Sequence, residues 1–223
     1  MAVRLVSYSK ATDEFATEGL TDLQELIAFC AKVSNPQAQI NTETSERLIK
    51  YLIKHAHWSP LEMVNATLEI ETTRDIAHQI VRHRSFAFQE FSQRYADPAE
   101  MGNQFVVREA RLQDPKNRQN SVETDDGALE GAWIAHQNAV IARAKQAYEW
   151  AIENGIAKEQ ARAVLPEGNT KTRLYMNGTI RSRVHYIDLR SANGTQKEHM
   201  EIAVQCAKVI AEIFPMANDL SKL

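Results

Sequence analysis

The segment 64–71 constrains the fold of this chain more than any other, because its side chains alternate without a break. Val64, Ala66, Leu68 and Ile70 are apolar, and a polar residue follows each of them. Successive side chains of a β-strand point to opposite faces, so this alternation predicts a strand with one buried and one exposed face. The segments 3–8, 103–108 and 172–177 are predicted as further strands.

Helical patterns separate these strands. One helix is expected to open at Thr21, whose spacing to Gln24 fits a capping box, and another covers about 43–56, with Leu48, Tyr51 and Leu52 on one face. Further helices are predicted to begin at Thr72, to cover 128–154 and 158–164, to follow Thr179, and to end the chain. The stretch 111–121 is predicted to be a loop, and 123–127 an acidic, mobile one. These elements predict an α/β (α+β) fold: one compact domain over 1–223, with a mixed or antiparallel sheet flanked by helices.

Composition limits the functions open to this chain. A net charge of −3 over 223 residues gives no general attraction to nucleic acid or to anionic membranes. No apolar run approaches the roughly 20 residues that span a bilayer, and the N-terminus lacks the apolar core of a signal peptide. Cys30 and Cys206 lie on apolar helical stripes, which predicts core packing and a reducing cytoplasm.

A segment rich in arginine and aromatic residues, 82–95, follows the helix predicted from Thr72. Guanidinium groups bind phosphate and carboxylate through paired hydrogen bonds and stack on planar rings. The segment therefore suits an anionic, planar ligand such as a nucleotide, although a solvated basic helix end has a similar composition. Gln79 and Arg82 share a helix face and are expected to address one ligand, whereas His83 points to another side.

The order of residues in this segment resembles the signature of the flavin-dependent thymidylate synthases. The matching residues are Arg82, His83, Arg84, Glu90, Ser92, Arg94 and Tyr95. Further matches are the segment 59–62, the Ala-Arg-x-x-Leu-Pro element around Arg162, and the Leu-Arg and Gln-x-Glu pairs within 189–198. The chain differs at Ala87, Gln89 and Thr179, where the family usually has serine, asparagine and asparagine.

This resemblance implies a set of substrate-binding residues for dUMP. They are Gln79, Arg82, Glu90, Phe91, Ser92, Gln93, Arg94, Arg162 and Arg190. Arg190 is also expected to be catalytic, because it would stabilise the charge that develops on the pyrimidine.

The resemblance also implies an FAD site, formed by Ser59, Arg82, His83, Arg84, Ser85, Glu90, Thr179, Arg181 and His185. The reaction it implies is the methylation of dUMP to dTMP without a cysteine nucleophile. Methylenetetrahydrofolate would donate the carbon, FAD would carry the hydride and NADPH would be the reductant. The family assembles its active sites between the subunits of a homotetramer, which is the expected assembly here.

Two other classes of function remain open at this point. The arginine and aromatic segment could serve a nucleic-acid-binding module as a stacking platform, but the overall acidity argues against it. His55 and His57 have a spacing that metal ligands can have, as in a phosphohydrolase, but no further ligands lie nearby in the sequence. We therefore expect no metal site and no nucleic-acid partner.

Overall fold

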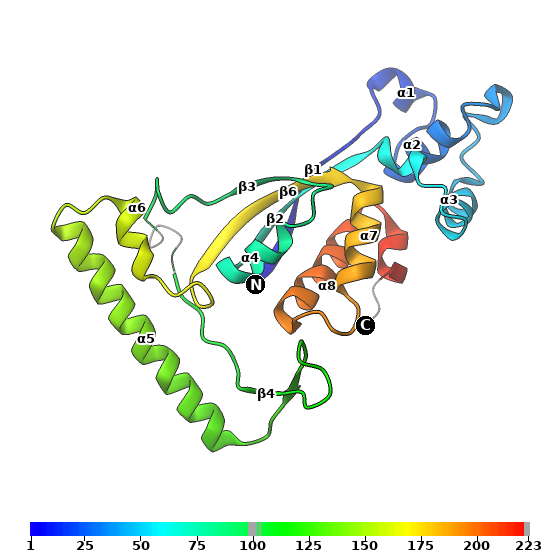
Figure 1. Ribbon diagram of the computed structural model, residues 1–223. Coiled ribbons are helices and arrows are strands. Elements are labelled where there is room, and N and C mark those ends of the chain that lie inside the picture. The colour runs from blue at the N-terminus through cyan, green and yellow to red at the C-terminus, as the bar shows by residue number, and fades with distance from the viewer. Residues whose placement is uncertain (98–101, 103, 221–223) are drawn as a thin grey trace.

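The centre of the molecule is an antiparallel sheet, seen in a computed structural model that describes residues 1–97, 102 and 104–220. Its strands lie in the order β1 (Ala2–Tyr8), β2 (Asn65–Thr73), β6 (Lys171–Thr179) and β3 (Ala87–Glu90) (Figure 1). The two central strands, β2 and β6, pair over their whole length. Ala66, Leu68 and Ile70 are buried, so the strand predicted from the alternation is confirmed.

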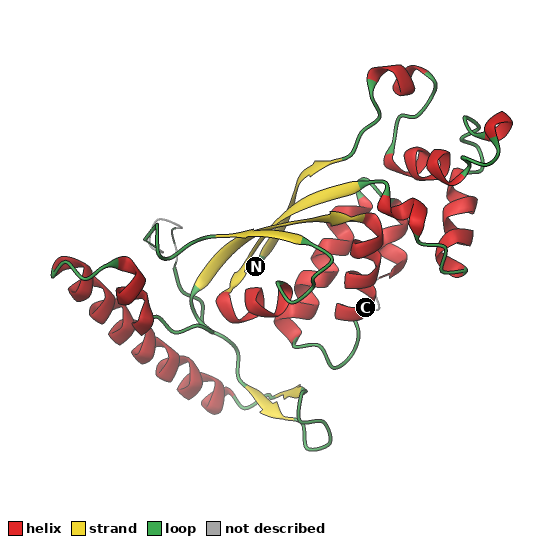
Figure 2. Cartoon of the chain, turned by 45° about the horizontal axis from the view of Figure 1, so that its top comes forward, coloured by secondary structure: helices red, strands yellow, loops and turns green. Residues whose placement is uncertain are grey.

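Three helices cover one face of this sheet: α4 (Arg74–Ile80), α7 (Ile180–Arg190) and α8 (Lys197–Ala211), which η5 (Pro215–Leu220) follows (Figures 1 and 2). Their apolar stripes form the main core with β2 and β6. Its fully buried members include Leu68, Ile70, Ile76, Ile80, Leu174, Met176, Ile187, Ile202, Cys206 and Phe214. Each buried side chain of this size stabilises the fold by roughly 1.5–3 kcal/mol. The core therefore fixes α4, α7 and α8 against the sheet.

A group of short helices lies at one end of the sheet: α1 (Asp13–Thr17), α2 (Leu23–Ala31), η1 (Pro36–Ala38), α3 (Ser45–Lys54) and η2 (Ser59–Glu62). The capping box of α2 is formed by Asp22 and Glu25, one residue later than predicted, because this pair also has the required spacing. Tyr51 was expected on the buried face of α3 but is half exposed, and Ile49 is buried instead.

A long excursion separates β3 from β6. It contains the hairpin β4 (Arg111–Gln113) and β5 (Ser121–Glu123), then α5 (Gly127–Glu153), α6 (Lys158–Ala161) and η4 (Arg162–Val164). Asp126 caps α5 by accepting hydrogen bonds from the backbone of Ala128 and Leu129, each at 3.0 Å. Figure 1 shows α5 lying away from the sheet and its covering helices.

Two predictions about this excursion were wrong. The strand expected over 103–108 is reduced, in its described residues, to one bridge between Phe105 and Thr170, because the chain meets only the start of β6 before it turns away; Asn103 lies outside the described residues. The stretch 111–121, predicted as a loop, instead forms a hairpin: it begins with β4, and its last residue is the first residue of β5. Asp114 holds its turn, accepting from the backbone of Lys116 at 2.8 Å.

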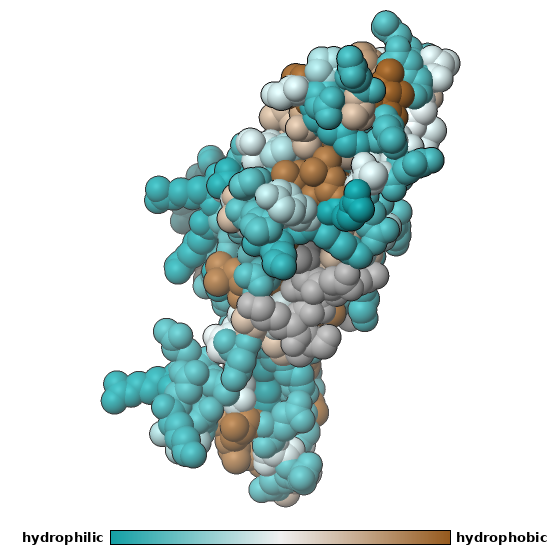
Figure 3. Space-filling view, turned by 90° about the vertical axis from the view of Figure 1, so that its right-hand side faces the viewer, coloured by the Kyte–Doolittle hydropathy of each residue, from teal (hydrophilic) through white to brown (hydrophobic). Residues whose placement is uncertain are grey.

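Figure 3 views the molecule from the end that carries α1, α2 and α3. This face is mainly hydrophilic, and its hydrophobic residues form small separate patches. Among the described residues, no helix combines the length and the apolar character that crossing a bilayer would require.

Candidate active site

The Arg82-His83-Arg84 segment, called the arginine triplet from here on, lies in a turn between α4 and β3, close to the end of α4 as predicted. The buried ring of Phe86 anchors this turn. It packs against Gly178 of β6, and the buried guanidinium of Arg183 lies 4.8 Å from the centre of the ring. The ring of Tyr186 is 6.0 Å away. The anchor leaves Arg82, Arg84 and Ser85 exposed at the surface.

His83 turns inward from the same segment and contacts Arg190, the last residue of α7. The Nε of Arg190 donates a hydrogen bond of 2.9 Å to Nε2 of His83. Burial, together with the nearby Arg190 guanidinium, lowers the pKa of His83 to about 4, so the ring is neutral near pH 7 and can accept this bond. His83 thus contacts Arg190, and its predicted role in binding flavin stays a prediction.

A pocket of about 500 Å³ lies beside this pair and is lined by Asp75, His78, Gln79, Arg82, Glu167 and Arg190. Three of the predicted substrate residues, Gln79, Arg82 and Arg190, thus meet in one place. Its volume is within the range of about 300–1,000 Å³ that is typical of small-molecule sites.

Both carboxylates of this pocket already have partners within the chain. Asp75 accepts from Arg108 Nη2 at 2.7 Å, and Glu167 contacts His78. The guanidinium groups of Arg82 and Arg190 can therefore bind an anionic ligand, Arg190 through the donors that its bond to His83 does not use.

The remaining predicted substrate residues do not line this pocket. Glu90 accepts hydrogen bonds from Thr172 at 2.9 Å and from Arg74 at 3.3 Å, which ties it to the sheet. Arg94 pairs with Glu159 of α6 at 3.1 Å. Phe91 binds β6 through its backbone, Ser92 is exposed, Gln93 is buried, and the partly buried Arg162 opens η4. One chain alone, in its described residues, therefore brings together only part of the predicted substrate set.

Several of the residues predicted to bind flavin, namely Ser59, Ser85, Thr179 and Arg181, lie around the N-terminus of α7. Thr179 caps this helix, accepting from the backbone of Ser182 at 3.1 Å, and the Ser182 hydroxyl donates to the carbonyl of Ser85 at 3.2 Å. Arg181 pairs with Glu62 of η2, the helix that Ser59 opens. This arrangement joins the turn after α4, the start of α7 and η2 in one place.

These residues fit a flavin dinucleotide. The exposed guanidinium groups of Arg82 and Arg84 and the helix N-terminus suit a diphosphate. The rings of Trp58 and His185 pack at 4.5 Å and suit a planar ring system. Glu90 is instead tied to the sheet by its hydrogen bonds from Thr172 and Arg74.

The sequence did not point to Tyr186 and His199, which lie behind the pocket. His199 is fully buried on α8, and its Nδ1 is 3.2 Å from Oε1 of Gln79. Its Nε2 is 3.1 Å from the hydroxyl of Tyr186. The sequence does contain one signal for His199: its spacing of three residues to Ile202 and seven to Cys206 places it on the apolar, buried stripe of α8.

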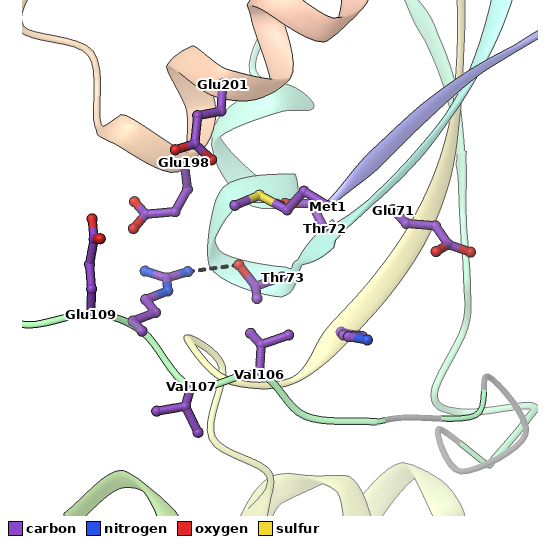
Figure 4. A pocket seen from close by; sticks show the side chains of 11 residues that line it. Met1, Glu71, Thr72, Thr73, Val106, Val107, Glu109, Glu198 and Glu201 are labelled. Atoms are coloured by element: carbon purple, nitrogen blue, oxygen red, sulfur yellow. Dashed lines mark hydrogen bonds between the residues drawn. The ribbon is translucent and has the colours of Figure 1, made fainter. Parts of the chain in front are cut away.

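A second hollow, of about 430 Å³, lies on the other side of Arg108. Figure 4 shows Glu198 and Glu201 projecting from α8 toward it. Arg108, which also lines this hollow, donates a hydrogen bond of 2.7 Å to Thr73. Glu198 also contacts Arg111. None of the predicted site residues lines this hollow.

Neither cysteine has the surroundings of a nucleophile. Cys206 is fully buried, and burial raises the pKa of its thiol to about 12. Cys30 is half-buried rather than buried, and burial raises the pKa of its thiol as well. A nucleophilic thiolate needs a lowered pKa.

His55 and His57 pack around Tyr51, with ring centres 4.2 and 5.9 Å from it. Within the described residues, no group of three or more histidine, cysteine or acidic side chains has the geometry to hold a metal ion.

Comparison with known proteins places this geometry in a family. Residues 17–216 match the family described as "Thymidylate synthase complementing protein". The "Probable flavin-dependent thymidylate synthase" of Paramecium bursaria Chlorella virus 1 is 46% identical over 215 residues, which cover 96% of each chain. The "Flavin-dependent thymidylate synthase" of Synechocystis sp. is equally similar, with the same coverage.

A crystal structure of a UMP/dUMP methylase, PolB from Streptomyces cacaoi, bound with 5-Br dUMP, has a similar fold. The TM-score is 0.78 at 25% sequence identity, over 98% of this chain and 93% of that one. The resemblance carried by the arginine triplet, the element around Arg162 and the segment 189–198 is thereby confirmed. This chain belongs to the flavin-dependent thymidylate synthase family.

Proposed function

We propose that this protein methylates dUMP to dTMP, with methylenetetrahydrofolate as the carbon donor, FAD as the bound cofactor and NADPH as the reductant. The observation that carries the proposal is the pocket in which Gln79, Arg82 and Arg190 meet. Its two guanidinium groups suit a nucleotide monophosphate, and the relatives' names support the reaction.

Arg190 is the residue we assign to catalysis. Methylation at C5 of uracil places negative charge on the ring, and a fixed guanidinium beside the ring stabilises that charge. The hydrogen bond to neutral His83 fixes the guanidinium before the substrate arrives. Arg82 and Gln79 line the same pocket and would hold the nucleotide beside it.

FAD would be held by Ser59, Ser85, Thr179, Arg181 and His185, together with Arg82, His83, Arg84 and Glu90. When bound and reduced by NADPH, the flavin would supply the hydride that the reaction requires. The exposed arginines bind its diphosphate, and the α7 N-terminus adds backbone donors. A cysteine nucleophile is not needed, and the raised thiol pKa values of Cys30 and Cys206 support its absence.

A second copy of the chain would complete the substrate site. Phe91, Ser92, Gln93, Arg94 and Arg162 do not line the pocket of their own chain. We infer that they serve the pocket of a neighbouring subunit in a homotetramer. Both cysteines are free thiols, which supports a cytoplasmic location.

An absorbance spectrum of the purified protein, before and after addition of dUMP, tests the proposal most directly. We expect a flavin spectrum that changes when dUMP binds, and formation of dTMP once folate and NADPH are supplied. Protein that is folded but takes up no FAD on titration, or that forms no dTMP when loaded with it, would refute the function. The mass in solution, measured by light scattering, tests the tetramer separately.

A further inference from the structure

A continuous chain of hydrogen bonds runs behind the substrate pocket, through side chains of α4, α7 and α8. Tyr186 contacts His199 at 3.1 Å, and His199 contacts Gln79 at 3.2 Å. Gln79 donates from Nε2 to Gln196 at 2.7 Å, and Gln196 donates from Nε2 to Glu198 at 2.9 Å. Tyr186 and His199 are almost completely buried, so the chain is sealed from solvent at that end.

The negative charge of Glu198, at the other end of this series of hydrogen bonds, determines which group donates and which accepts in each bond. Glu198 contacts Arg111, and an ionised carboxylate can only accept hydrogen bonds. Gln196 must therefore turn its NH2 toward Glu198 and its oxygen toward Gln79. Gln79 must then turn its NH2 toward Gln196 and its oxygen toward His199.

The same logic fixes the tautomer of the histidine. Because the oxygen of Gln79 can only accept, His199 carries its proton on Nδ1, and its Nε2 accepts from the hydroxyl of Tyr186. Burial and the nearby Arg190 lower the pKa of His199 to about 3, so the ring stays neutral. Reversing any one amide would place two donors or two acceptors face to face.

Gln79 also lines the substrate pocket, and its NH2 group has two hydrogens. Gln196 takes one of them, so the second can be donated to a ligand in the pocket. Arg82 and Arg190, the neighbouring cations in the pocket, offer donors as well. A ligand seated against these three residues must present acceptor oxygens.

We propose that His199 is a positioning residue that holds the Gln79 amide in one orientation, so that Gln79 offers a hydrogen-bond donor, and never an acceptor, to the substrate. Glu198, two hydrogen bonds away from Gln79, determines that orientation through its charge. The inference rests on the proposed function for the identity of the substrate. The atom recognised is an acceptor oxygen, either of the phosphate or of a pyrimidine carbonyl.

In this scheme, the substitution Glu198→Gln reverses the donor and acceptor roles in every hydrogen bond between residue 198 and Tyr186. The new amide must turn its oxygen to Arg111 and its NH2 to Gln196, so each following amide flips and His199 moves its proton to Nε2. Glu201→Gln is the matched control, since Glu201 projects from the same helix into the same hollow and has no place in the hydrogen-bond chain.

The tautomer of His199 is measured by nitrogen NMR of protein labelled in its histidine rings, without any ligand. We expect the proton on Nδ1 in the wild type and in Glu201→Gln, and on Nε2 in Glu198→Gln. The affinity for dUMP, measured by calorimetry, should fall about tenfold in Glu198→Gln and change less than about twofold in Glu201→Gln. A wild-type tautomer or a wild-type affinity in Glu198→Gln overturns the proposal.

A second pair of variants tests His199 itself. Asparagine places its NH2 near the position of Nδ1 and should restore the bond to Gln79, whereas glutamine reaches toward the position of Nε2 and should not. We expect His199→Asn to bind dUMP more tightly than His199→Gln by about tenfold, with both folded by thermal melting. Equal affinities would mean that His199 only fills space. Should neither variant fold, the two glutamate variants still decide the matter.

Inorganic phosphate as a competing ligand identifies the atom that is recognised. A loss for both phosphate and dUMP in Glu198→Gln assigns the acceptor to the phosphate group, and a loss for dUMP alone assigns it to the pyrimidine. Failure of the wild type to bind dUMP would refute the proposed function, whereas the NMR measurement tests the hydrogen-bond chain without any substrate.

Discussion

Replacing Gly178 by alanine should displace the turn that carries the arginine triplet. A Cβ at this position would lie 2.8 Å from Cε1 of Phe86 and closer still to Cδ1, whereas ordinary carbon contacts begin near 3.4 Å. The backbone of Gly178 lies outside the left-handed region, so the effect is steric alone. Phe86 cannot simply move aside, because Arg183 and Tyr186 pack on the same ring.

Overpacking of this kind costs about 1–3 kcal/mol. In a chain of 223 residues, each kcal/mol lowers the melting temperature by about 2–4 °C, so we expect a decrease of about 2–12 °C. The displaced turn also carries His83, Arg84 and Ser85, so FAD affinity should fall in the same variant. Differential scanning fluorimetry and flavin titration measure the two effects.

Two further variants make this prediction specific. Gly131→Ala, in the N-terminal part of α5 with open space around the new methyl group, should stabilise the protein slightly. Phe86→Leu combined with Gly178→Ala should be less destabilising than the sum of the two single changes, because the smaller side chain makes room. A Gly178→Ala protein with the wild-type melting temperature and FAD affinity would show that the contact with Phe86 does not hold the turn.

Three other predictions follow from the site. Arg190→Ala should keep its fold and its FAD but form dTMP about 100- to 1,000-fold more slowly, and Arg190→Lys should not recover fully; a wild-type rate in single-turnover assays would remove Arg190 from catalysis. The double variant Cys30→Ala, Cys206→Ala should still form dTMP when folded, with a stability loss of order 1 kcal/mol per site; its inactivity, reversed by restoring one cysteine, would contradict the cysteine-free mechanism. His83 binds its proton more weakly in the folded than in the unfolded protein, so its contribution to stability should be lost as the pH falls from about 6.5 toward 4. Urea denaturation at several pH values should show a weaker pH dependence in His83→Gln, and an unchanged dependence would be evidence against a neutral His83.

The local sequence pattern was sufficient to predict an element wherever only one periodicity was present in the segment. The alternation of 64–71 predicted β2, and the spacing of Gln79 and Arg82 placed both on the face that lines the pocket. Prediction failed where two patterns compete: Thr21 with Gln24 and Asp22 with Glu25 both satisfy the capping rule, and the structure uses the second. The strand β3 was missed because four residues are too few to show a period.

The periodicity of apolar and polar residues could not predict contacts between segments that are distant in the sequence. The orientation of His83 depends on Arg190, which lies 107 residues further along the chain. The roles of His199 and Tyr186 depend on the packing of α7 against α8. Helical periodicity can place both residues on a buried face, but it does not show which side chain of the other helix each one contacts.

The pairing of β2 with β6 has a consequence for how the chain is made. A hydrogen bond between Thr67 and Asn177 joins residues 110 positions apart. Sheets that depend on such distant pairing fold slowly, and an unpaired strand edge attracts other chains. During synthesis, the edge of β2 that pairs with β6 has no partner until β6 leaves the ribosome. Because β6 follows α5 in the sequence, the whole of α5 is made first. At about 5–20 residues per second, the nascent chain carries an open sheet edge for several seconds.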